Sequence, residues 1–523
     1  MKTRIIKEAR TLLPAFALVL GATFVEVLVQ ENPRDPWSGL MIFLFVTGCI
    51  VMGAETFGNE FQKRTMPLLL SQPVPRAMMW REKMRILACA LAFGAAVLAG
   101  AVYYFNRRIF ELPDFPSTVF AIGFALIPLC AFGTAPFWTL TFRSTLLGAV
   151  FTLLAPAVLV MLNAVVHEYV FNRNLEDEHS INAFLYSAFA LVFLYSAVCC
   201  WLGFRLFTRL QVVGISASRE VALPAQWENI FIQPFRKISA RFTGPFAALV
   251  KKELRLQQVS FLGAGLFVAV AIASTLLYQC HIGVGAAKMN VAEPILISDF
   301  AIYVLLLPLI SGSLAIAEEK SWGVADWQVT LPPSLRKQWF AKILVTLSTS
   351  LVLGLALPAL AYLVGDFVLH GISSEASANR PFIVPLLAVL LVIVVHLLLT
   401  SVVVYAASFC NSTVNAVLLS VAMLVTAGIV IRIGLFFPFY DYANGVQSIF
   451  ASDQKDVEIK ITLLAVELAG LLFLLWLVQR FAFACYRNRG WTLRRRLIQA
   501  CALGGILFVL AAFTSLLIFA FFA

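Results

Sequence analysis

The chain has 523 residues, of which 61% are hydrophobic and 13% are charged, and its mean hydropathy is +0.89. A soluble protein of this length has a more polar surface, so the composition excludes a soluble fold and predicts an all-α polytopic membrane protein. The net charge of +11 does not indicate a nucleic-acid partner, because basic residues of membrane proteins gather in cytoplasmic loops. The expected surroundings are the lipid bilayer.

The first ten residues are basic, and Lys2, Lys7 and Arg10 flank the apolar Ile5 and Ile6. This pattern predicts an amphipathic helix that lies flat at the cytoplasmic surface. No small-residue cleavage site follows the first apolar run, so we expect a retained helix rather than a signal peptide. A membrane-spanning helix needs roughly 20 apolar residues. The first part of the chain contains six such runs, at 12–29, 39–57, 86–105, 118–142, 145–166 and 182–207.

A polar segment at 209–250, with basic residues and prolines, predicts a cytoplasmic linker. Six more apolar runs follow it, at 258–280, 295–317, 343–369, 382–409, 413–437 and 461–484. A last run, 498–522, comes after a basic cluster and brings the expected number of spans to thirteen. The predicted organisation is therefore a first six-helix half at 1–208, the linker, a second six-helix half at 251–490, and one additional transmembrane helix within 491–523.

One polar loop occurs twice, together with the helix ends that flank it. Residues 53–83 read GAETFGNEFQKRTMPLLLSQPVPRAMMWREK, and residues 312–342 read GSLAIAEEKSWGVADWQVTLPPSLRKQWFAK. A shift of 259 residues, without a gap, superposes five identical pairs: Gly53 and Gly312, Glu60 and Glu319, Pro73 and Pro332, Trp80 and Trp339, and Lys83 and Lys342. Each copy leaves an apolar run, crosses a polar loop and passes a proline before the next run begins.

Two further segments recur at corresponding places. KEAR at 7–10 and KELR at 252–255 each precede the first span of a half, and TFRSTLLGAV at 141–150 resembles SFCNSTVNAV at 408–417. Halves with an even number of spans have the same orientation. The pattern therefore predicts two parallel six-helix repeats about an axis along the membrane normal.

Basic residues alternate between the predicted loops. Most lysines and arginines lie in the amino terminus and in loops 59–85, 209–257, 318–342 and 485–496, which we expect to be cytoplasmic. The remaining loops are poor in basic residues, and 167–181 is acidic. Arg107 and Arg108 are the main exception, which snorkelling at the outer interface explains. With thirteen spans, the amino terminus is expected to be cytoplasmic and the carboxyl terminus external.

The sequence offers no motif for catalysis, for a cofactor or for a metal. The nine cysteines are scattered without a CxxC pair, which favours small apolar packing residues over disulfides or ligands. The segment GVGAAKM at 283–289 lacks the glycine–lysine–serine/threonine ending of a phosphate-binding loop. If ATP is used, we expect its site on another polypeptide.

The acidic residue, the LLLSQPVPR step and the lysine that opens the next helix resemble the ABC-2 type permease, the membrane subunit of ABC exporters. The second copy is looser at the serine–proline step. In that family, this loop is similar to the coupling helix that docks on a cytoplasmic ATPase. The resemblance implies a transporter subunit rather than an enzyme, in the bacterial inner membrane, with two copies of a separate ATPase. The implied coupling residues are Glu60, Arg64, Pro73, Arg76 and Lys83 in the first loop, and Glu319, Pro332 and Lys342 in the second.

Other interpretations stay open for single residues. Glu60 and Glu319 bind the ATPase, or they only favour a helix amino terminus at the membrane surface. Ionisable groups inside spans are costly and by default functional. His396 and Glu467 are the deepest of these, and they either form an intramembrane polar site or bond a neighbouring helix. Three others lie near the ends of runs, where snorkelling explains them: Glu26, Glu55 and Arg432.

Two other functions stay open for the whole chain. An ATP-independent secondary transporter with parallel repeats predicts paired deep charges and broken helices in corresponding places, and the sequence does not show them. A non-transporting membrane assembly factor on the same fold is the third possibility, since a fold does not determine a function.

Overall fold

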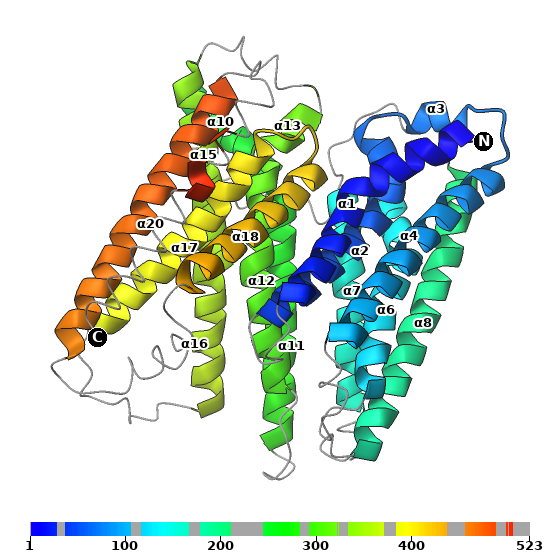
Figure 1. The fold of residues 1–523 in the computed structure, drawn as a ribbon, viewed down its shortest axis with the longest axis horizontal. Helices are drawn as coiled ribbons and strands as arrows, with labels where there is room; N and C mark the ends of the chain where they lie inside the picture. Colours follow the sequence, from blue (N-terminus) through cyan, green and yellow to red (C-terminus); the bar gives the residue numbers. More distant parts are fainter. Residues whose placement is uncertain are drawn as a thin grey trace. The chain divides into compact units, whose positions relative to one another are not determined.

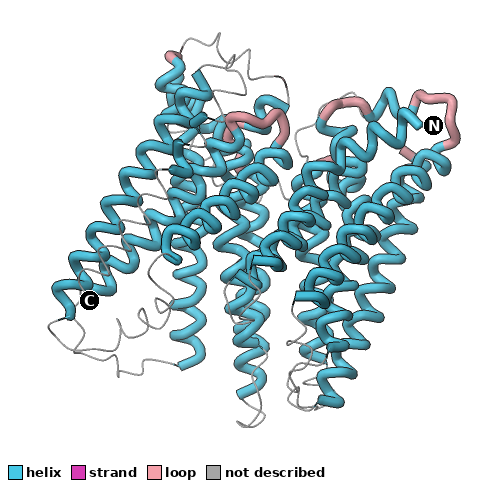
Figure 2. The backbone as a smooth tube through the Cα atoms, in the orientation of Figure 1, coloured by secondary structure: helices cyan, strands magenta, loops and turns pink. Residues whose placement is uncertain are grey.

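The structure is a computed structural model. It describes residues 2–28, 37–105, 117–166, 178–210, 244–282, 292–321, 323, 333–370, 383–436, 456–487, 498–499 and 502–505. All of the regular elements in these ranges are helices, and Figure 2 shows the few connections that the structure describes as short loops.

The helices of the first half follow the six predicted runs closely (Figure 1). A five-residue helix, α3, is the only addition among the described residues of this half, and it lies in the loop between the second and third runs. The elements are α1 (Lys2–Leu28), α2 (Trp37–Gln62), α3 (Met66–Leu70), α4 (Arg76–Phe105), α6 (Ser117–Phe142), α7 (Thr145–Val165) and α8 (Glu178–Arg209).

The second half also has a helix at each of its six predicted runs, and its third run is subdivided. The third run consists of two α-helices joined through a π-helical segment, η3. The elements are α10 (Pro245–Leu256), α11 (Gln258–Ile282), α12 (Ala292–Leu314), α13 (Ala317–Ser321), α15 (Leu335–Leu351), η3 (Val352–Ala356), α16 (Leu357–His370), α17 (Ile383–Ala407), α18 (Thr413–Phe436) and α20 (Asp456–Arg487).

Eight helices in the described part of the chain are long and apolar enough to cross a membrane, or nine if the bent pair α10–α11 is counted as one span. Three shorter apolar helical stretches lie in α7, α12 and α18. The chain is therefore an all-helical, multi-pass membrane protein. The predicted thirteenth span, 498–522, lies mostly outside the described residues.

The contacts divide the chain into two compact units. One unit holds Met1–Lys237 with Ile272–Ser298, and the other holds Ile238–Ala271 with Asp299–Ala523. The first change of unit falls inside the segment predicted as a linker, of which 211–243 lie outside the described residues. The sequence placed Ile272–Ser298 in the second half, whereas the contacts assign this segment to the first unit. The parallel repeat itself stays a prediction.

The start of the chain differs from the expectation of a separate surface helix. KEAR lies within α1, which runs without interruption from Lys2 to Leu28. The second half does have a separate helix, because α10 and α11 meet at 52°. Gln257 lies at this bend, is buried, and donates from Nε2 to the carbonyl oxygen of Ser311 at 3.0 Å. This bond ties the bend to α12.

Glycine allows close packing at the head of each repeated loop. A Cβ on Gly53 in α2 would lie 2.5 Å from the carbonyl oxygen of Ala131 in α6. A Cβ on Gly312 in α12 would lie 2.7 Å from the Cβ of Val403 in α17. Small residues let helix backbones approach closely in membranes, where the hydrophobic effect does not drive helices together. Each glycine thus fits the span before the loop tightly against its neighbour.

The helices α7 and α18 begin with the same cap. The Ser144 Oγ accepts from the Leu147 N–H at 3.4 Å, and the Ser412 Oγ accepts from the Asn415 N–H at 3.2 Å. These serines are 268 residues apart, so the recurring Ser-Thr pair lies nine residues later in the second half than the shift of 259 residues implies.

Candidate functional site

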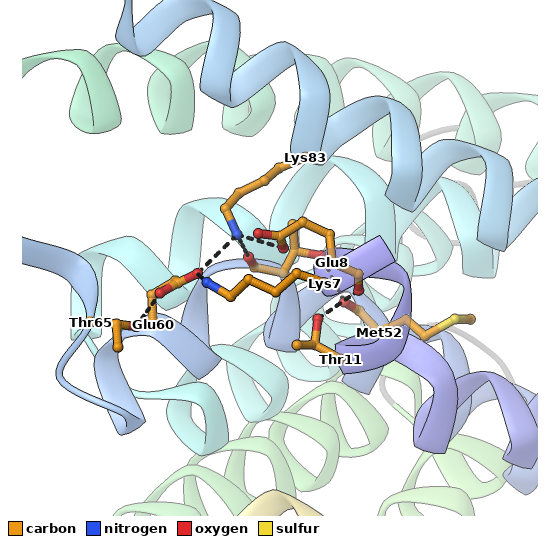
Figure 3. Close-up of polar contacts among 8 residues, drawn as sticks. Lys7, Glu8, Thr11, Met52, Glu60, Thr65 and Lys83 are labelled. Atoms are coloured by element: carbon orange, nitrogen blue, oxygen red, sulfur yellow. Dashed lines mark hydrogen bonds and ion pairs between the residues drawn. The ribbon is translucent and has the colours of Figure 1, made fainter. Parts of the chain in front are cut away.

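Two of the recurring segments, 7–10 and 53–83, meet in the first half as an ion cluster in which all but Lys7 are buried (Figure 3). The Lys83 Nζ on α4 lies 2.7 Å from the Glu8 Oε2 on α1 and 3.6 Å from the Glu60 Oε1 near the end of α2. The Lys7 Nζ lies 3.1 Å from the same Glu60 oxygen. Lys83 also donates to the carbonyl oxygen of Thr56 at 3.0 Å. Both Glu60 and Lys83 are 4% exposed.

The second half contains the same four residue types, and we call these two groups the first and second ion clusters. The Lys342 Nζ on α15 lies 2.8 Å from the Glu253 Oε1 on α10 and forms a closer ion pair with Glu319 on α13. Lys252 pairs with Glu319 at 2.5 Å. Lys342 donates to the carbonyl oxygen of Ala315 at 3.4 Å. Ala315 follows Thr56 by the same 259 residues that separate the two lysines.

Each ion cluster consists of two carboxylates and two ammonium groups, so its formal charges cancel. Burying an ion costs several kcal/mol unless close partners compensate it. Removing one member leaves a buried charge unpaired, which typically costs about 3–5 kcal/mol. Each cluster connects the helix before the loop, the helix after it and the first helix of that half. It therefore ties both ends of the loop to the first helix of the half.

The burial of the two glutamates changes the interpretation of both. Glu60 lies in the last turn of α2, so the proposal that it favours a helix amino terminus is wrong. Glu319 does lie in the first turn of a helix, the five-residue α13, but it is 2% exposed and paired with two lysines. Neither carboxylate is a surface group in this structure.

The surroundings of α13 act differently on its two adjacent carboxyls. Burial alone would raise the pKa of Glu319, but the charges of Lys342 and Lys252 outweigh it and hold the pKa below its ordinary value. Glu318 is half-buried, and desolvation raises its pKa to about 7. One carboxyl is thus stabilised as an anion, and the next one gains a proton near neutral pH.

Arg64 and Gly323 have the same unusual backbone. Arg64, after α2, has a φ of 55°, and Gly323, after α13, has a φ of 69°. They are 259 residues apart, so the chain turns in the left-handed region at the same position of both loops. Arg64 itself is exposed.

The other predicted coupling residues of the loops have separate positions. Pro73 is exposed in the turn between α3 and α4. Arg76 donates from Nη1 to the carbonyl oxygens of Thr208 and Leu210, at 2.8 and 2.7 Å, where α8 ends. A cation at a helix carboxyl terminus satisfies its free carbonyl groups. Arg76 therefore has a structural role as a cap, and Pro332 lies outside the described residues.

The recurring tryptophans anchor the helices that follow the loops. Trp80 stacks on Phe57 with ring centroids 4.9 Å apart and contacts Phe207 on α8 at 5.8 Å. Trp339 contacts Phe483 and Tyr486 on α20 at 5.8 and 5.2 Å. In each half, the helix after the loop is thus packed against the last span through one indole ring.

The intramembrane candidates do not form one site. His396 is buried on α17 and bonds Ser350 on α15, with its Nε2 3.0 Å from both the carbonyl oxygen and the Oγ of Ser350. These contacts support the interpretation that His396 bonds a neighbouring helix. Glu467 lies in α20, but its side chain is outside the described part of the chain, as are those of Glu26 and Arg432.

Glu55 contradicts the snorkelling interpretation. It lies seven residues before the end of α2, is 7% exposed, and its Oε2 has no hydrogen-bond partner among the described residues. In the ungapped comparison it corresponds to Leu314. The first half therefore has a buried carboxyl that the second half lacks.

The sequence identified Glu60, Glu319 and both central lysines through their recurrence, but it did not identify Glu8 and Glu253 as their partners. The signal was the recurring lysine–glutamate pair before each first span. Among the described residues, no group of three or more His, Cys, Asp or Glu side chains is placed to hold a metal ion.

The architecture and the two ion clusters were compared with known proteins. No family model matches the chain, and neither curated proteins nor solved structures give a match.

Proposed function

We propose that this chain is the membrane permease subunit of an ATP-driven ABC exporter and couples a separate cytoplasmic ATPase to movement of a substrate across the membrane. The single observation that carries the proposal is the pair of ion clusters. Both use a lysine–glutamate pair, a glutamate and a lysine in the same chain order, and both lie at the base of the recurring loop.

A coupling loop needs a firm base and an accessible tip, and the first loop has both. Its short helix α3 buries Met66, Leu69 and Leu70, whereas Leu68 on the opposite side is 67% exposed. The following residues Ser71–Pro73 are exposed as well. We assign the ATPase contact to this tip, because Glu60 is enclosed at the base. An exposed apolar side chain beside polar ones is typical of a protein interface.

The second loop offers an accessible surface at the start of α15. Arg336 and Lys337 are exposed, and Phe340 is 59% exposed on the same helix. Lys342, two residues later, is enclosed in the second ion cluster. The same division between an exposed contact and a buried support therefore occurs in both loops.

Coupling in this proposal proceeds through the helices that each cluster joins. A movement of the loop tip is transmitted to the ion cluster. The cluster transmits it to the first helix of the half and to the long helix after the loop. Two ATPase copies, one on each loop, move the two halves against each other and alternately open a path between them. The chain itself supplies no ATP site in this scheme, which is the expectation from its sequence.

The test is position-specific photo-cross-linking in the native membrane. A photoreactive amino acid replaces Leu68 in one variant and Lys337 in another, and Tyr104 serves as a matched control because it is 68% exposed at the opposite end of α4. We expect both loop positions, and not Tyr104, to capture the same polypeptide. That polypeptide must hydrolyse ATP after purification.

Two outcomes contradict the proposal. Capture of a polypeptide without ATPase activity at both loop positions supports the assembly-factor interpretation. Equal capture at Tyr104 and at the loops shows that the loops have no specific partner.

A further inference from the structure

The long third span of the second half contains a π-helical turn that its counterpart lacks. The π segment Val352–Ala356 separates α15 from α16. The ungapped comparison places it on Phe93–Val97 of α4, which is one uninterrupted α-helix from Arg76 to Phe105. π-turns are rare in proteins and are frequent at functional sites.

Pro358 explains why the helix widens here. In an α-helix, residue 358 would donate its N–H to the carbonyl of Gly354, but proline has no N–H and its ring collides with that carbonyl. In the structure, the N–H of Leu357 reaches back five residues to the carbonyl of Val352. The carbonyl of Leu353 thus loses its α-helical donor, Leu357, and its π-helical donor would be Pro358, which has none.

A side chain from another helix satisfies this carbonyl. The Tyr303 hydroxyl, on α12, donates to the carbonyl oxygen of Leu353 at 3.0 Å. Tyr303 is 6% exposed, and Leu353 packs against the core cluster that contains it. An unpaired carbonyl in a membrane costs several kcal/mol, so this bond favours the π register over the α register.

His396 supports the same segment from a third helix. Its Nε2 is 3.0 Å from the carbonyl oxygen of Ser350, one turn before the π segment. Its ring lies against Gly354, where an added Cβ would be 2.8 Å from both Cε1 and Nε2. Glycine at 354 is therefore what lets the histidine approach the backbone.

The corresponding positions of the first half lack these polar groups. The shift of 259 residues places Tyr303 on Leu44, Ser350 on Leu91 and Gly354 on Ala95. The polar groups and the π-turn are thus both absent from the corresponding helix, which links them to each other.

We infer that Tyr303, His396 and Pro358 form a two-register hinge, in which the third span of the second half switches between the observed π-turn and a continuous α-helix. In the π register the Leu353 carbonyl has no backbone donor and accepts from the Tyr303 hydroxyl instead. In the α register Leu353 would regain the Leu357 N–H, and Gly354 would face Pro358, which has no N–H. Because Tyr303 lies on α12, a movement of α12 that breaks its bond to Leu353 would favour the α register.

The switch changes the face of α16 that packs in the core. Each residue of an α-helix turns by about 100° and rises 1.5 Å, so closing the π-turn advances α16 by about one residue. Leu360, now 60% exposed, then takes the place of Ala361, which packs against the Phe267–Tyr303 cluster. Leu363, now 65% exposed, takes the place of Val364, which is exposed as well.

These two positions give the test. A spin label on an introduced keto amino acid, which avoids the native cysteines, is placed at Leu360 or at Leu363 in the full chain. In the native sequence, oxygen in the bilayer should reach both labels. In a Tyr303→Phe variant, the Leu353 carbonyl loses its donor in the π register, so the ratio of registers should shift toward the α-helix by at least about fivefold. The Tyr303→Phe, Pro358→Ala double variant should be α-helical throughout, because Gly354 regains its donor.

The label at Leu360 should therefore lose oxygen access in the double variant, whereas the label at Leu363 keeps it. Tyr405→Phe is the matched control, because the Tyr405 hydroxyl is fully buried and has no partner among the described residues. It should leave both labels unchanged. The inference is overturned if the Leu360 label in a folded double variant has the same oxygen access as in the native sequence, or if both labels change together.

Discussion

The Lys83 ammonium lies between two carboxylates inside a protein whose spans are almost free of charge, and Lys342 does the same in the other half. Such groups are stable only as complete sets, because each charge compensates the desolvation of its neighbours. Glu55, 7% exposed and without a described partner for its Oε2, is the contrasting case.

Glutamine substitutions separate these two kinds of glutamate. Glu60→Gln keeps the shape of the side chain but leaves Lys83 and Lys7 with one carboxylate instead of two, so we expect a loss of about 3 kcal/mol of unfolding free energy. Glu55→Gln should change the stability by less than about 1 kcal/mol, because the Glu55 Oε2 has no hydrogen-bond partner among the described residues to lose. Thermal unfolding of both variants in detergent measures the difference. Equal losses would show that Glu60 contributes no more than an unpaired group.

The two carboxyls of α13 predict opposite pH dependences. The pKa of Glu318 is raised from 4.5 to about 7, so its contribution to stability is complete below pH 4.5 and is lost as the pH rises through 7. The pKa of Glu319 is lowered, so its contribution is present above pH 4.5 and is lost as the pH falls further.

Glu318→Gln should therefore raise the unfolding temperature at pH 8 relative to the native chain and have little effect at pH 4.5. Glu319→Gln should lower it at pH 8. Unfolding temperatures measured between pH 4 and pH 8 check both signs. A Glu318→Gln difference that is the same at every pH would show that this carboxyl does not titrate in the window.

At the scale of elements, the chain uses one turn twice. The helix before each loop is followed by a residue in the left-handed region, Arg64 in one half and Gly323 in the other. Only glycine adopts this conformation without a steric cost, which for other residues is roughly 1–2 kcal/mol. The turn at Arg64 therefore carries a steric strain that the same turn at Gly323 does not.

Gly323→Ala tests the requirement for this turn. An added Cβ meets no atom of the described residues within 4 Å, so we expect the loss of stability to come from the backbone conformation. We expect a loss of about 1 kcal/mol in unfolding free energy. Gly263→Ala is the control: its Cβ also meets no atom within 4 Å, but it lies inside α11, where alanine is the better helix former and should stabilise slightly. Losses in both variants would contradict the strained turn.

The sequence predicted the elements better than their connections. Twelve apolar runs coincide with helices because a membrane span needs only a sufficient length of apolar residues, which is a local property. The π-turn was not predicted, because the Tyr303 hydroxyl that stabilises it comes from another helix. The partners of Lys83 were missed for the same reason, since Glu8 precedes it by 75 residues.

At the scale of the whole molecule, the two halves share the chemistry of their loops and differ in their third spans. Both have an ion cluster and an indole anchor. Only the second has the π-turn with its histidine and tyrosine contacts. If the proposed coupling to an ATPase holds, halves that differ in this way are expected to transmit its movement unequally.

The basic loops predict the orientation of the chain, and reporter fusions test this prediction. Fusions after Arg85, Arg241 and Arg496 should report a cytoplasmic position, because lysine and arginine are retained on that side. Fusions after Glu178, Asp456 and Ala523 should report an external position. A cytoplasmic carboxyl terminus would mean that one predicted span does not cross, and an external Arg85 would remove the loops from any cytoplasmic partner.

The mass of the intact complex tests the proposed function most directly. The full chain is purified from its native membrane in mild detergent, and the complex is weighed by native mass spectrometry, with and without a Leu68→Glu, Phe340→Glu pair of substitutions at the exposed loop surfaces. We predict two copies of one ATP-hydrolysing polypeptide per chain, and their loss in the doubly substituted variant. A complex with one copy or none, or two copies that persist when both surfaces carry the new charge, would contradict coupling through the repeated loops.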